Sequence, residues 1–220
     1  LSCYGLVALG NGKGILAAFR YLCVGTMGAS MYLLGIGFLY SATGTLNMAD
    51  MSQRLAPYMD SPQGILAGGS LIVCFGIKMA LFPFHRWQSD TYTYAHSAAV
   101  PLIAGAMSKV FAYGLLRFFF FIFLPQGRAM ETLLTILGLL ACAGILWGSV
   151  MAIAQRDFRR MLAFSSVAQI GYIVLGFSIG NANGLTGSLL HLLCHALMKG
   201  TLFLCIGGIV YRYGETDFFR

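Results

Sequence analysis

The sequence is poor in charged residues, which make up only 10% of its 220 residues. Soluble domains carry about 25%, so an ordinary soluble fold is excluded. The short alternating segments of about ten residues that build a membrane β-barrel are also missing. The chain has instead continuous apolar runs, several of them longer than the roughly 20 residues that cross a bilayer as a helix. These features favour an all-α polytopic membrane protein.

Acidic residues are scarce, and none lies inside an apolar run. The seven Asp and Glu residues fall in predicted loops or at helix ends: Asp50, Asp60, Asp90, Glu131, Asp157, Glu215 and Asp217. Lys and Arg number 14, which gives a net charge of +7. These basic residues lie mainly at the ends of apolar runs, a pattern of membrane topology rather than of nucleic-acid binding. We therefore expect no nucleic acid as a partner.

The six cysteines are scattered singly, and no pair has metal or redox spacing. We interpret them as small hydrophobic side chains. Haem ligation by histidine is the competing interpretation. Two haem ligands normally come from different helices, whereas His191 and His195 share one helical face and His85 and His96 lie in a predicted loop. We expect no catalytic residue, metal, haem or other cofactor in this chain.

The apolar runs predict six complete spans, at Ile15–Tyr40, Gly64–Phe84, Ala98–Leu124, Leu133–Ile153, Met161–Ile179 and Leu185–Val210. Leu1–Leu9 is interpreted as the tail of a further helix, so we expect the true start of the protein to lie upstream. The polar stretches Ser41–Pro62 and His85–His96 are predicted to be connectors. Residues 1–220 are predicted to form a single transmembrane domain without a soluble domain.

The basic residues predict an orientation. With six spans, one side collects Lys13, Arg20, Arg86, Arg156, Arg159, Arg160, Arg212 and Arg220, and the other only Arg54, Arg117 and Arg128. Loops rich in Lys and Arg face the cytoplasm. We therefore expect the loops with Arg86 and Arg156–Arg160 on the cytoplasmic side of a bacterial or archaeal plasma membrane, or on the equivalent side of an organelle inner membrane.

Three lysines lie deep inside apolar runs: Lys78, Lys109 and Lys199. A charged amine at the centre of a bilayer costs roughly 3 kcal/mol on insertion scales. Such residues persist where they line a polar path. Because the apolar runs hold no carboxylate, each amine must contact water, release its proton or pair with a group elsewhere. The pattern predicts a membrane protein that moves charge.

Pro83 follows Lys78 by five residues. Proline removes a backbone hydrogen bond and clashes with the carbonyl four residues back, which here belongs to Met79. We therefore predict a broken helix near Pro83, beside the lysine. Broken helices at membrane depth are tolerated where they line a cavity. The alternative is a lysine that extends to the interface.

Lys109 lies near the middle of its span, too far from either end to reach the interface easily. His191, His195 and Lys199 follow one another at intervals of four residues, so they share one helical stripe about 12 Å long. Histidine exchanges protons near neutral pH. We predict a proton relay through Lys78, Lys109, His191, His195 and Lys199. The alternative is that the histidines are core residues bonded to neighbouring helices.

Five segments together resemble a known family: FGIKMALFPFHRW, AGAMSKVFAYGLLR, QRDFRRMLAFSSVAQIGY, HLLCHALMKGTLFL and YLLGIGFLYSATGTLNMADM. They are similar in content and order to the antiporter-like membrane subunits. That family comprises the proton-pumping subunits of respiratory complex I, the D-type subunits of Mrp sodium/proton antiporters and the membrane subunits of energy-converting hydrogenases. The resemblance covers nearly the whole chain.

The resemblance implies a helical bundle of two inverted repeats, each with a broken helix, in subunits about twice as long as this chain. Lys78 then matches the lysine of the first broken helix, and Lys109 matches the central lysine. The stripe from His191 to Lys199 matches the polar stripe of the second repeat. The family glutamate that pairs with the first lysine would fall upstream of Leu1. Gln169 departs from the pattern, because a histidine is common there.

The predicted function is proton translocation, with Na⁺ as a second candidate ion. The chain would act in a redox-driven complex such as NADH:quinone oxidoreductase, in a related hydrogenase or in an Mrp-type antiporter. Its expected partners are other membrane subunits and membrane lipid. A stand-alone transporter of an anionic solute and a membrane scaffold are the alternatives that the sequence leaves open.

Overall fold

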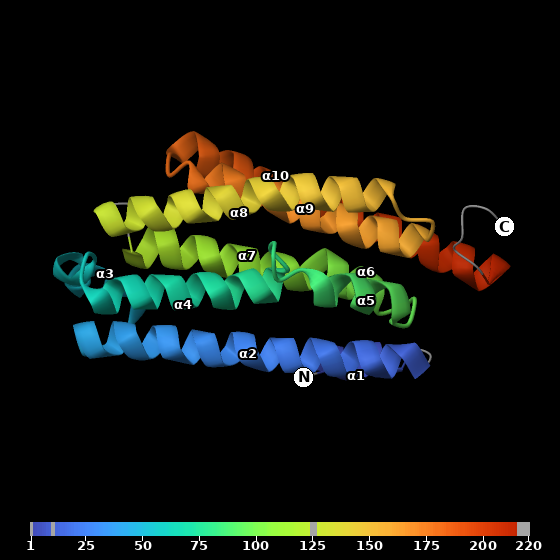
Figure 1. Cartoon of the computed structure of the whole chain (residues 1–220), viewed down its shortest axis with the longest axis horizontal. Helices are drawn as coiled ribbons and strands as arrows, with labels where there is room; N and C mark the ends of the chain where they lie inside the picture. The colour runs from blue at the N-terminus through green and yellow to red at the C-terminus, as the bar shows by residue number, and fades with distance from the viewer. Residues whose placement is uncertain (1, 10–11, 124–126, 215–220) are drawn as a thin grey trace.

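The computed structural model describes residues 2–9, 12–123 and 127–214, and these ranges contain helices and no strand (Figure 1). The elements are α1 (Ser2–Ala8), α2 (Gly12–Thr43), α3 (Met48–Arg54), the 3₁₀ turn η1 (Ala56–Tyr58), α4 (Pro62–Met79), α5 (Arg86–Tyr94), α6 (Val100–Leu102), the π-helical η2 (Ile103–Met107), α7 (Ser108–Arg117), the π-helical η3 (Phe118–Phe123), α8 (Arg128–Ile153), α9 (Phe158–Ser178) and α10 (Ala182–Tyr213). Leu1 and Leu124, which the predicted segments include, lie outside the described residues.

Six helical segments of the described chain are long and apolar enough to cross a membrane: α2, α4, α6–η3, α8, α9 and α10. They run roughly side by side, and successive segments alternate in direction (Figure 1). The predicted all-α polytopic fold is therefore confirmed. Most of the segments begin or end a few residues away from the predicted bounds, because polar residues at helix ends still adopt helical backbone.

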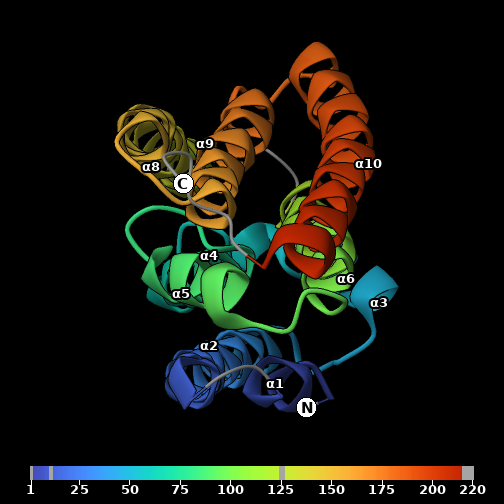
Figure 2. The same cartoon turned by 90° about the vertical axis from the view of Figure 1, so that its right-hand side faces the viewer.

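The bundle has a central group of helices with others packed on either side. Seen end-on, α2 lies on one side, α8, α9 and α10 lie on the other, and α4–α6 lie between them (Figure 2). Apolar side chains on the outer helices face outward; Leu33 and Leu146 are each 70% exposed. Water would penalise such a surface, but lipid tails do not. Exposed apolar faces of this kind are typical of helices that cross a membrane.

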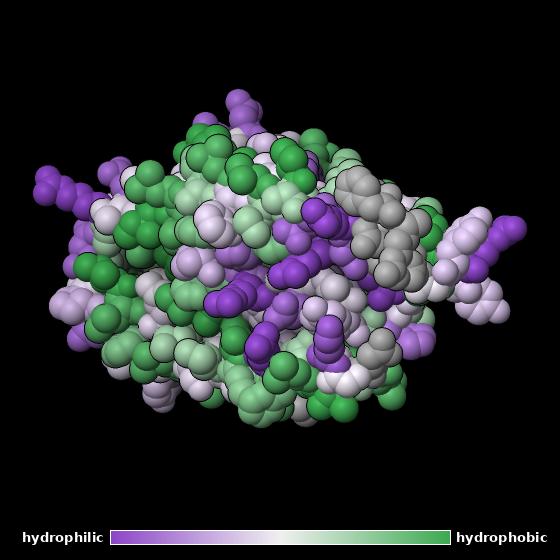
Figure 3. Space-filling view, turned by 45° about the vertical axis from the view of Figure 1, so that its right-hand side comes forward, coloured by the Kyte–Doolittle hydropathy of each residue, from purple (hydrophilic) through white to green (hydrophobic). Residues whose placement is uncertain are grey.

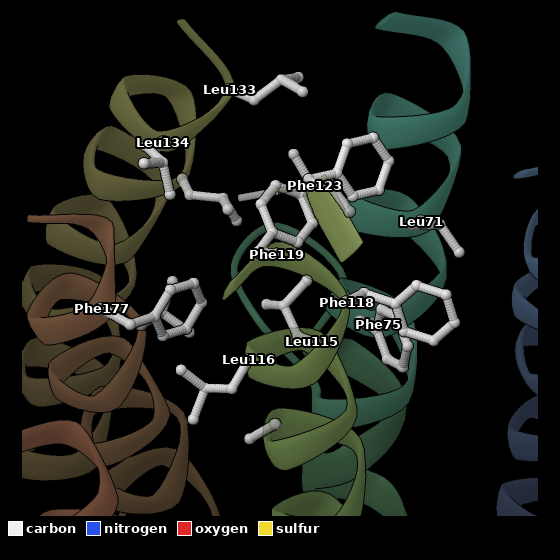
Figure 4. Close-up of a cluster of buried hydrophobic side chains, with 14 of the residues drawn as sticks. Leu71, Phe75, Leu115, Leu116, Phe118, Phe119, Phe123, Leu133, Leu134 and Phe177 are labelled. Atoms are coloured by element: carbon white, nitrogen blue, oxygen red, sulfur yellow. The ribbon is translucent and has the colours of Figure 1, made fainter. Parts of the chain in front are cut away.

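A cluster of buried aromatic and leucine side chains joins the spans in one half of the bundle. The members labelled in Figure 4 come from α4, α7, η3, α8 and α9. Phe119 and Phe177 are among the most deeply buried of them, at 1% and 0% exposed. Close helix contacts add to this packing; a Cβ atom on Gly148 of α8 would lie 2.7 Å from the Ala168 nitrogen of α9. Small residues at such contacts let helices associate in membranes by van der Waals packing.

The predicted helix break near Pro83 is confirmed. Helix α4 ends at Met79, and Ala80 adopts the left-handed conformation with φ 61°. The Leu81 N–H then donates to the Gly76 carbonyl at 2.8 Å, which closes the helix end as in a Schellman motif. The peptide bond from Phe82 to Pro83 is cis.

The segment after the break corrects two predictions. The second span was expected to reach Phe84 but ends five residues earlier, and His85–His96 was expected to be a connector. Most of it is instead the helix α5, with Trp87 and Tyr92 only 7% and 1% exposed. The Trp87 indole donates to the Ile77 carbonyl at 2.9 Å. The helix therefore packs back onto the end of α4, and its Trp87 adds a second hydrogen bond to a carbonyl that also accepts from the Ala80 N–H at 3.3 Å.

Candidate functional site

Helix α10 carries His191, His195 and Lys199 on one side, as their spacing predicts. His195 is fully buried and Lys199 is 1% exposed, whereas His191 is half-buried. The two imidazole rings lie nearly parallel, with centroids 6.2 Å apart. The stripe therefore faces the interior of the bundle, and His191 is its most exposed member.

Helix α9 supplies the hydrogen-bond partners of this stripe. The Lys199 amine donates to the Leu162 carbonyl and to the Ser165 hydroxyl, each at 3.0 Å. One end of the stripe is held by Gln169, whose Oε1 lies 2.7 Å from Nε2 of His191. The residue numbers of the partners increase along α9, from Leu162 to Gln169, while those of the stripe decrease along α10, from Lys199 to His191. This is the pattern expected of two antiparallel helices packed side by side. All of these partners are uncharged.

His195 differs from its neighbours on the stripe. Neither of its ring nitrogens has a hydrogen-bond partner among the described residues, although the side chain is fully buried. Buried polar groups are nearly always hydrogen-bonded, and an exception calls for an explanation. An imidazole that exchanges protons with a transient partner is one such explanation, because a permanent bond would hold it in one tautomer.

Lys109 joins this group from α7 and is only 5% exposed. Its amine donates to the Ala104 carbonyl in η2, the π-helical segment that precedes it. A π-helical turn is wider than an α-helical one and is frequent at functional sites. The charge of Lys109 interacts with Lys199 and with His195. The structure thus brings together four of the five predicted relay residues.

The segment η2 and the helix α10 lie in close contact beside this group. A Cβ atom on Gly105 of η2 would lie 3.6 Å from the Ala196 carbonyl and 3.6 Å from the Gly200 Cα, both in α10, which are ordinary van der Waals distances. Small residues at such contacts let helix backbones approach each other in membranes. Because Lys199 precedes Gly200 on α10, this contact lies next to the Lys199 backbone.

Lys78 lies in the last turn of α4, beside the break and half-buried. Its amine is 5.6 Å from the centre of the Phe111 ring on α7, a cation–π arrangement. On its other side is α2, where a Cβ atom on Gly25 would lie 3.5 Å from the amine. The negative end of the α4 dipole favours a cation here. Within the described part of the chain, no hydrogen bond joins Lys78 to Lys109.

Carboxylates take no part in this arrangement. Two ion pairs among the described residues, Arg20 with Asp90 and Arg54 with Asp50, each involve an exposed arginine and lie apart from this group. Glu215 and Asp217 lie outside the described residues. In the described ranges, no group of three His, Cys, Asp or Glu side chains could hold a metal ion.

This geometry permits proton transfer among the lysine and histidine side chains, whose hydrogen-bond partners are uncharged. An amine that donates to a carbonyl or a hydroxyl can release a proton and keep its remaining hydrogen bonds, and an imidazole can accept at one nitrogen and donate at the other. Sequence reasoning missed Ser165 and the Ala104 carbonyl, because each depends on how segments pack. Gln169 was identified only as a departure from the family pattern. It lies seven residues after Leu162 and therefore on the same face of α9, a signal that could have marked both as partners of one stripe.

Comparison with known proteins supports the family resemblance. A family described as NADH:quinone oxidoreductase/Mrp antiporter, TM, matches residues 1–220. NADH-quinone oxidoreductase subunit N of Desulforudis audaxviator is 52% identical over 97% of this chain and 42% of the relative. The D-type subunit of a Na(+)/H(+) antiporter from Alkalihalophilus pseudofirmus is 29% identical over 99% of this chain and 44% of the relative. The chain thus spans less than half the length of these relatives.

Two solved structures contain chains with the same fold. One belongs to the membrane-bound sulfane sulfur reductase, an archaeal respiratory membrane complex, with a TM-score of 0.92 and 28% identity over 98% of this chain and 44% of that one. The other belongs to the Mrp complex of Dietzia sp., with a TM-score of 0.88 and 28% identity over 99% of this chain and 40% of that one. By sequence and by fold, the chain belongs to the NADH:quinone oxidoreductase/Mrp antiporter transmembrane family.

Proposed function

We propose that residues 1–220 form a single transmembrane domain in the middle of an antiporter-like subunit that moves protons across the membrane. The observation that carries this proposal is a group of four bases in which Lys109, His195 and Lys199 are buried and His191 is half-buried. The hydrogen bonds that the two lysines and His191 make all go to uncharged partners. Membership of the family supports it, since a relative is named as a Na(+)/H(+) antiporter subunit. Na⁺ is the second candidate ion.

In the proposed mechanism, a charge change in a neighbouring subunit alters the protonation of Lys78. A proton then passes to Lys109, where the interaction with Lys199 and His195 continues the path along α10 to His191. Pro83 does not exchange protons in this mechanism. It contributes to the helix break, which ends α4 beside Lys78. The energy comes from redox chemistry in other subunits or from an ion gradient.

The proposed partners are other membrane subunits and membrane lipid. The similar structures are chains of multi-subunit membrane complexes, and the exposed apolar helix faces suit both kinds of contact. The basic residues support an orientation with Arg86 and Arg156–Arg160 on the cytoplasmic side of a bacterial or archaeal plasma membrane. This places the end of the bundle that holds α5 and the start of α9 at that side (Figure 1).

Two substitutions of Lys109 test the relay, made in the full-length subunit within its complex. Lys109→Ala removes the exchangeable proton, and Lys109→Arg keeps a positive charge that cannot be released. We expect each to reduce proton pumping in proteoliposomes at least about tenfold, the lower end of what proton-transfer groups contribute. Lys13→Ala, an exposed lysine in the same fold, is the matched control and should pump normally.

The outcomes separate the alternatives. Loss of pumping with intact assembly supports the relay. Normal pumping by Lys109→Arg alone would show that only a fixed charge is needed, and failed assembly would indicate a scaffold. Loss of uptake of an anionic solute, with proton pumping unchanged, would indicate a transporter of that solute. Replacing Na⁺ by K⁺ in the assay separates the two candidate ions, because only Na⁺ coupling would then stop.

A further inference from the structure

Three hollows meet around Arg86, at the end of the bundle that holds the break. One, of about 470 Å³, is lined by polar and aromatic side chains from α2, α5, α8 and α9. The second, of about 350 Å³, shares Arg20, Arg86 and Asp90 with the first. The third, of about 270 Å³, shares Pro83 and Arg86 with the first and Trp87 with the second. They therefore adjoin one another around Arg86 and are together called the groove, and none of their lining residues belongs to the Lys109–Lys199 group.

The groove is positively charged at its polar end. Arg20, Arg86 and Arg160 line it, and Asp90 is the one carboxylate among its described lining residues. Asp90 is already paired with Arg20 at 2.8 Å. In the described ranges, no ion pair involves Arg86 or Arg160. The polar end thus has a surplus of two positive charges, both on guanidinium groups, which are suited to bidentate contacts with phosphate.

A buried histidine adds an unused hydrogen-bonding group to the same hollow. His85 lines the 470 Å³ hollow, is 9% exposed, and its Nδ1 has no hydrogen-bond partner among the described residues. Burial, and to a smaller extent the charge of Arg86, lowers its pKa, so the ring is neutral at pH 7. In the tautomer with hydrogen on Nδ1, it can donate to an oxygen atom in the hollow.

The other end of the groove is apolar. The 270 Å³ hollow extends between α2 and α4, and apart from Arg86 its lining side chains are apolar or aromatic: Val24, Met27, Met31, Val73, Ile77, Pro83, Phe84 and Trp87. Methionine side chains adapt to irregular apolar ligands. Figure 3 shows hydrophilic residues gathered in a patch beside hydrophobic surface, in a view that turns the α5 end of the bundle toward the reader.

The groove lies at the depth of a membrane interface. Arg160 is the third residue of α9, and Met151, which also lines the polar hollow, lies two residues before the end of α8. The apolar hollow runs from there along α2, where each residue adds about 1.5 Å of depth. Met31, eleven residues beyond Arg20, therefore lies roughly 16 Å deeper.

We propose that this groove binds an anionic phospholipid, with its phosphate on Arg86, Arg160 and His85 and one acyl chain in the hollow between α2 and α4. Free phosphate would use only the polar end and would leave the apolar hollow without a role. A groove that is basic at the interface and apolar below it matches a lipid at both ends. The surplus of positive charge favours a headgroup without a cationic choline.

The test uses the purified full-length subunit, stripped of lipid in detergent and titrated with dioleoylphosphatidylglycerol, dioleoylphosphatidylcholine or inorganic phosphate. Bound lipid is counted by native mass spectrometry. The double variant Arg86→Gln/Arg160→Gln should bind phosphatidylglycerol at least about tenfold more weakly, because each charged hydrogen bond contributes substantially to affinity. Arg212→Gln, an exposed arginine outside the groove, is the matched control and should bind it normally. Arg86→Lys/Arg160→Lys should recover part of the affinity.

Each other result would overturn the proposal. Equal affinity of the double variant and the control would show that these arginines hold no lipid. Binding of inorganic phosphate as tight as that of phosphatidylglycerol would assign the site to free phosphate. In the intact complex, a photo-crosslinker in place of Ser89, which lines the polar hollow but is not a proposed phosphate ligand, would assign the groove to a protein contact if it captures a neighbouring subunit in place of lipid. Unchanged thermal unfolding of the double variant confirms that it is folded.

Discussion

His195 offers the sharpest test of whether the α10 stripe serves proton transfer or packing. Its imidazole is fully buried and both ring nitrogens lack a protein partner within the described residues. We predict that His195→Leu stabilises the full-length subunit while it abolishes pumping. His191→Leu, one helical turn away, should instead destabilise it, because His191 has a formed hydrogen bond to Gln169 at 2.7 Å.

The magnitudes follow from these contacts. A buried polar group without a partner costs about 1–3 kcal/mol, and leucine of similar size removes that cost without opening a cavity. His195→Leu should therefore raise the free energy of unfolding by about 1–3 kcal/mol. His191→Leu removes a hydrogen bond worth about 0.5–1.5 kcal/mol and leaves Gln169 without a partner, so the free energy should fall by about that amount.

The two variants are compared by thermal unfolding of the purified subunit in detergent and by proton pumping of the complex in proteoliposomes. Opposite shifts of the unfolding midpoint, with pumping lost in His195→Leu, are the expected pattern. A lower midpoint for His195→Leu would show that the imidazole makes stabilising contacts and is a core residue. Normal pumping by that variant would refute its place in the relay, whatever its stability.

Two further substitutions test the geometry around the site and around the break. Gly105→Leu should push η2 away from α10 and reduce pumping, with an overpacking cost of about 1–3 kcal/mol. Gly105→Ala should be tolerated, because its Cβ would make ordinary contacts at 3.6 Å. Equal pumping by the two variants would argue against a close contact between η2 and α10. Trp87→Phe keeps the stack on Tyr21 but loses the bond to the Ile77 carbonyl, which still accepts from the Ala80 N–H, so the unfolding midpoint should fall by the equivalent of about 0.5–1.5 kcal/mol. An unchanged midpoint would show that the end of α4 does not need this bond.

The membrane fold was predictable because its signal is local. Span length and composition do not depend on which helices meet, so the six spans follow from the sequence. The break near Pro83 was predictable for the same reason. Helix α5 was not, because its residues are typical of a polar loop. In the structure two of its buried polar side chains bond within the helix: Gln88 donates to the Tyr92 hydroxyl at 2.9 Å, and Thr91 donates to the Trp87 carbonyl at 2.8 Å.

The candidate site likewise has features that local sequence predicts and features that depend on how helices pack. The stripe on α10 follows from a spacing of four residues within one helix. Its partners on α9 depend on the register between two helices, and the bond from Lys109 to Ala104 depends on a π-helical segment. Single-sequence periodicity carries no information on either feature. The three arginines of the groove were interpreted only as topology signals, since their shared hollow appears when α2, α5 and α9 are brought together.

The absence of a carboxylate from the described site has a physical consequence for how it works. A lysine paired with a buried carboxylate would be held as a fixed ion pair, since separating the two charges in a low-dielectric interior is costly. Lys109 and Lys199 donate instead to carbonyl and hydroxyl oxygens, which accept from a charged or a neutral amine. Like charges repel each other, most strongly where water is scarce, so a proton on one of the two amines disfavours a proton on the other. A group built only from bases and uncharged partners therefore favours one proton at a time, which is the condition for passing it along.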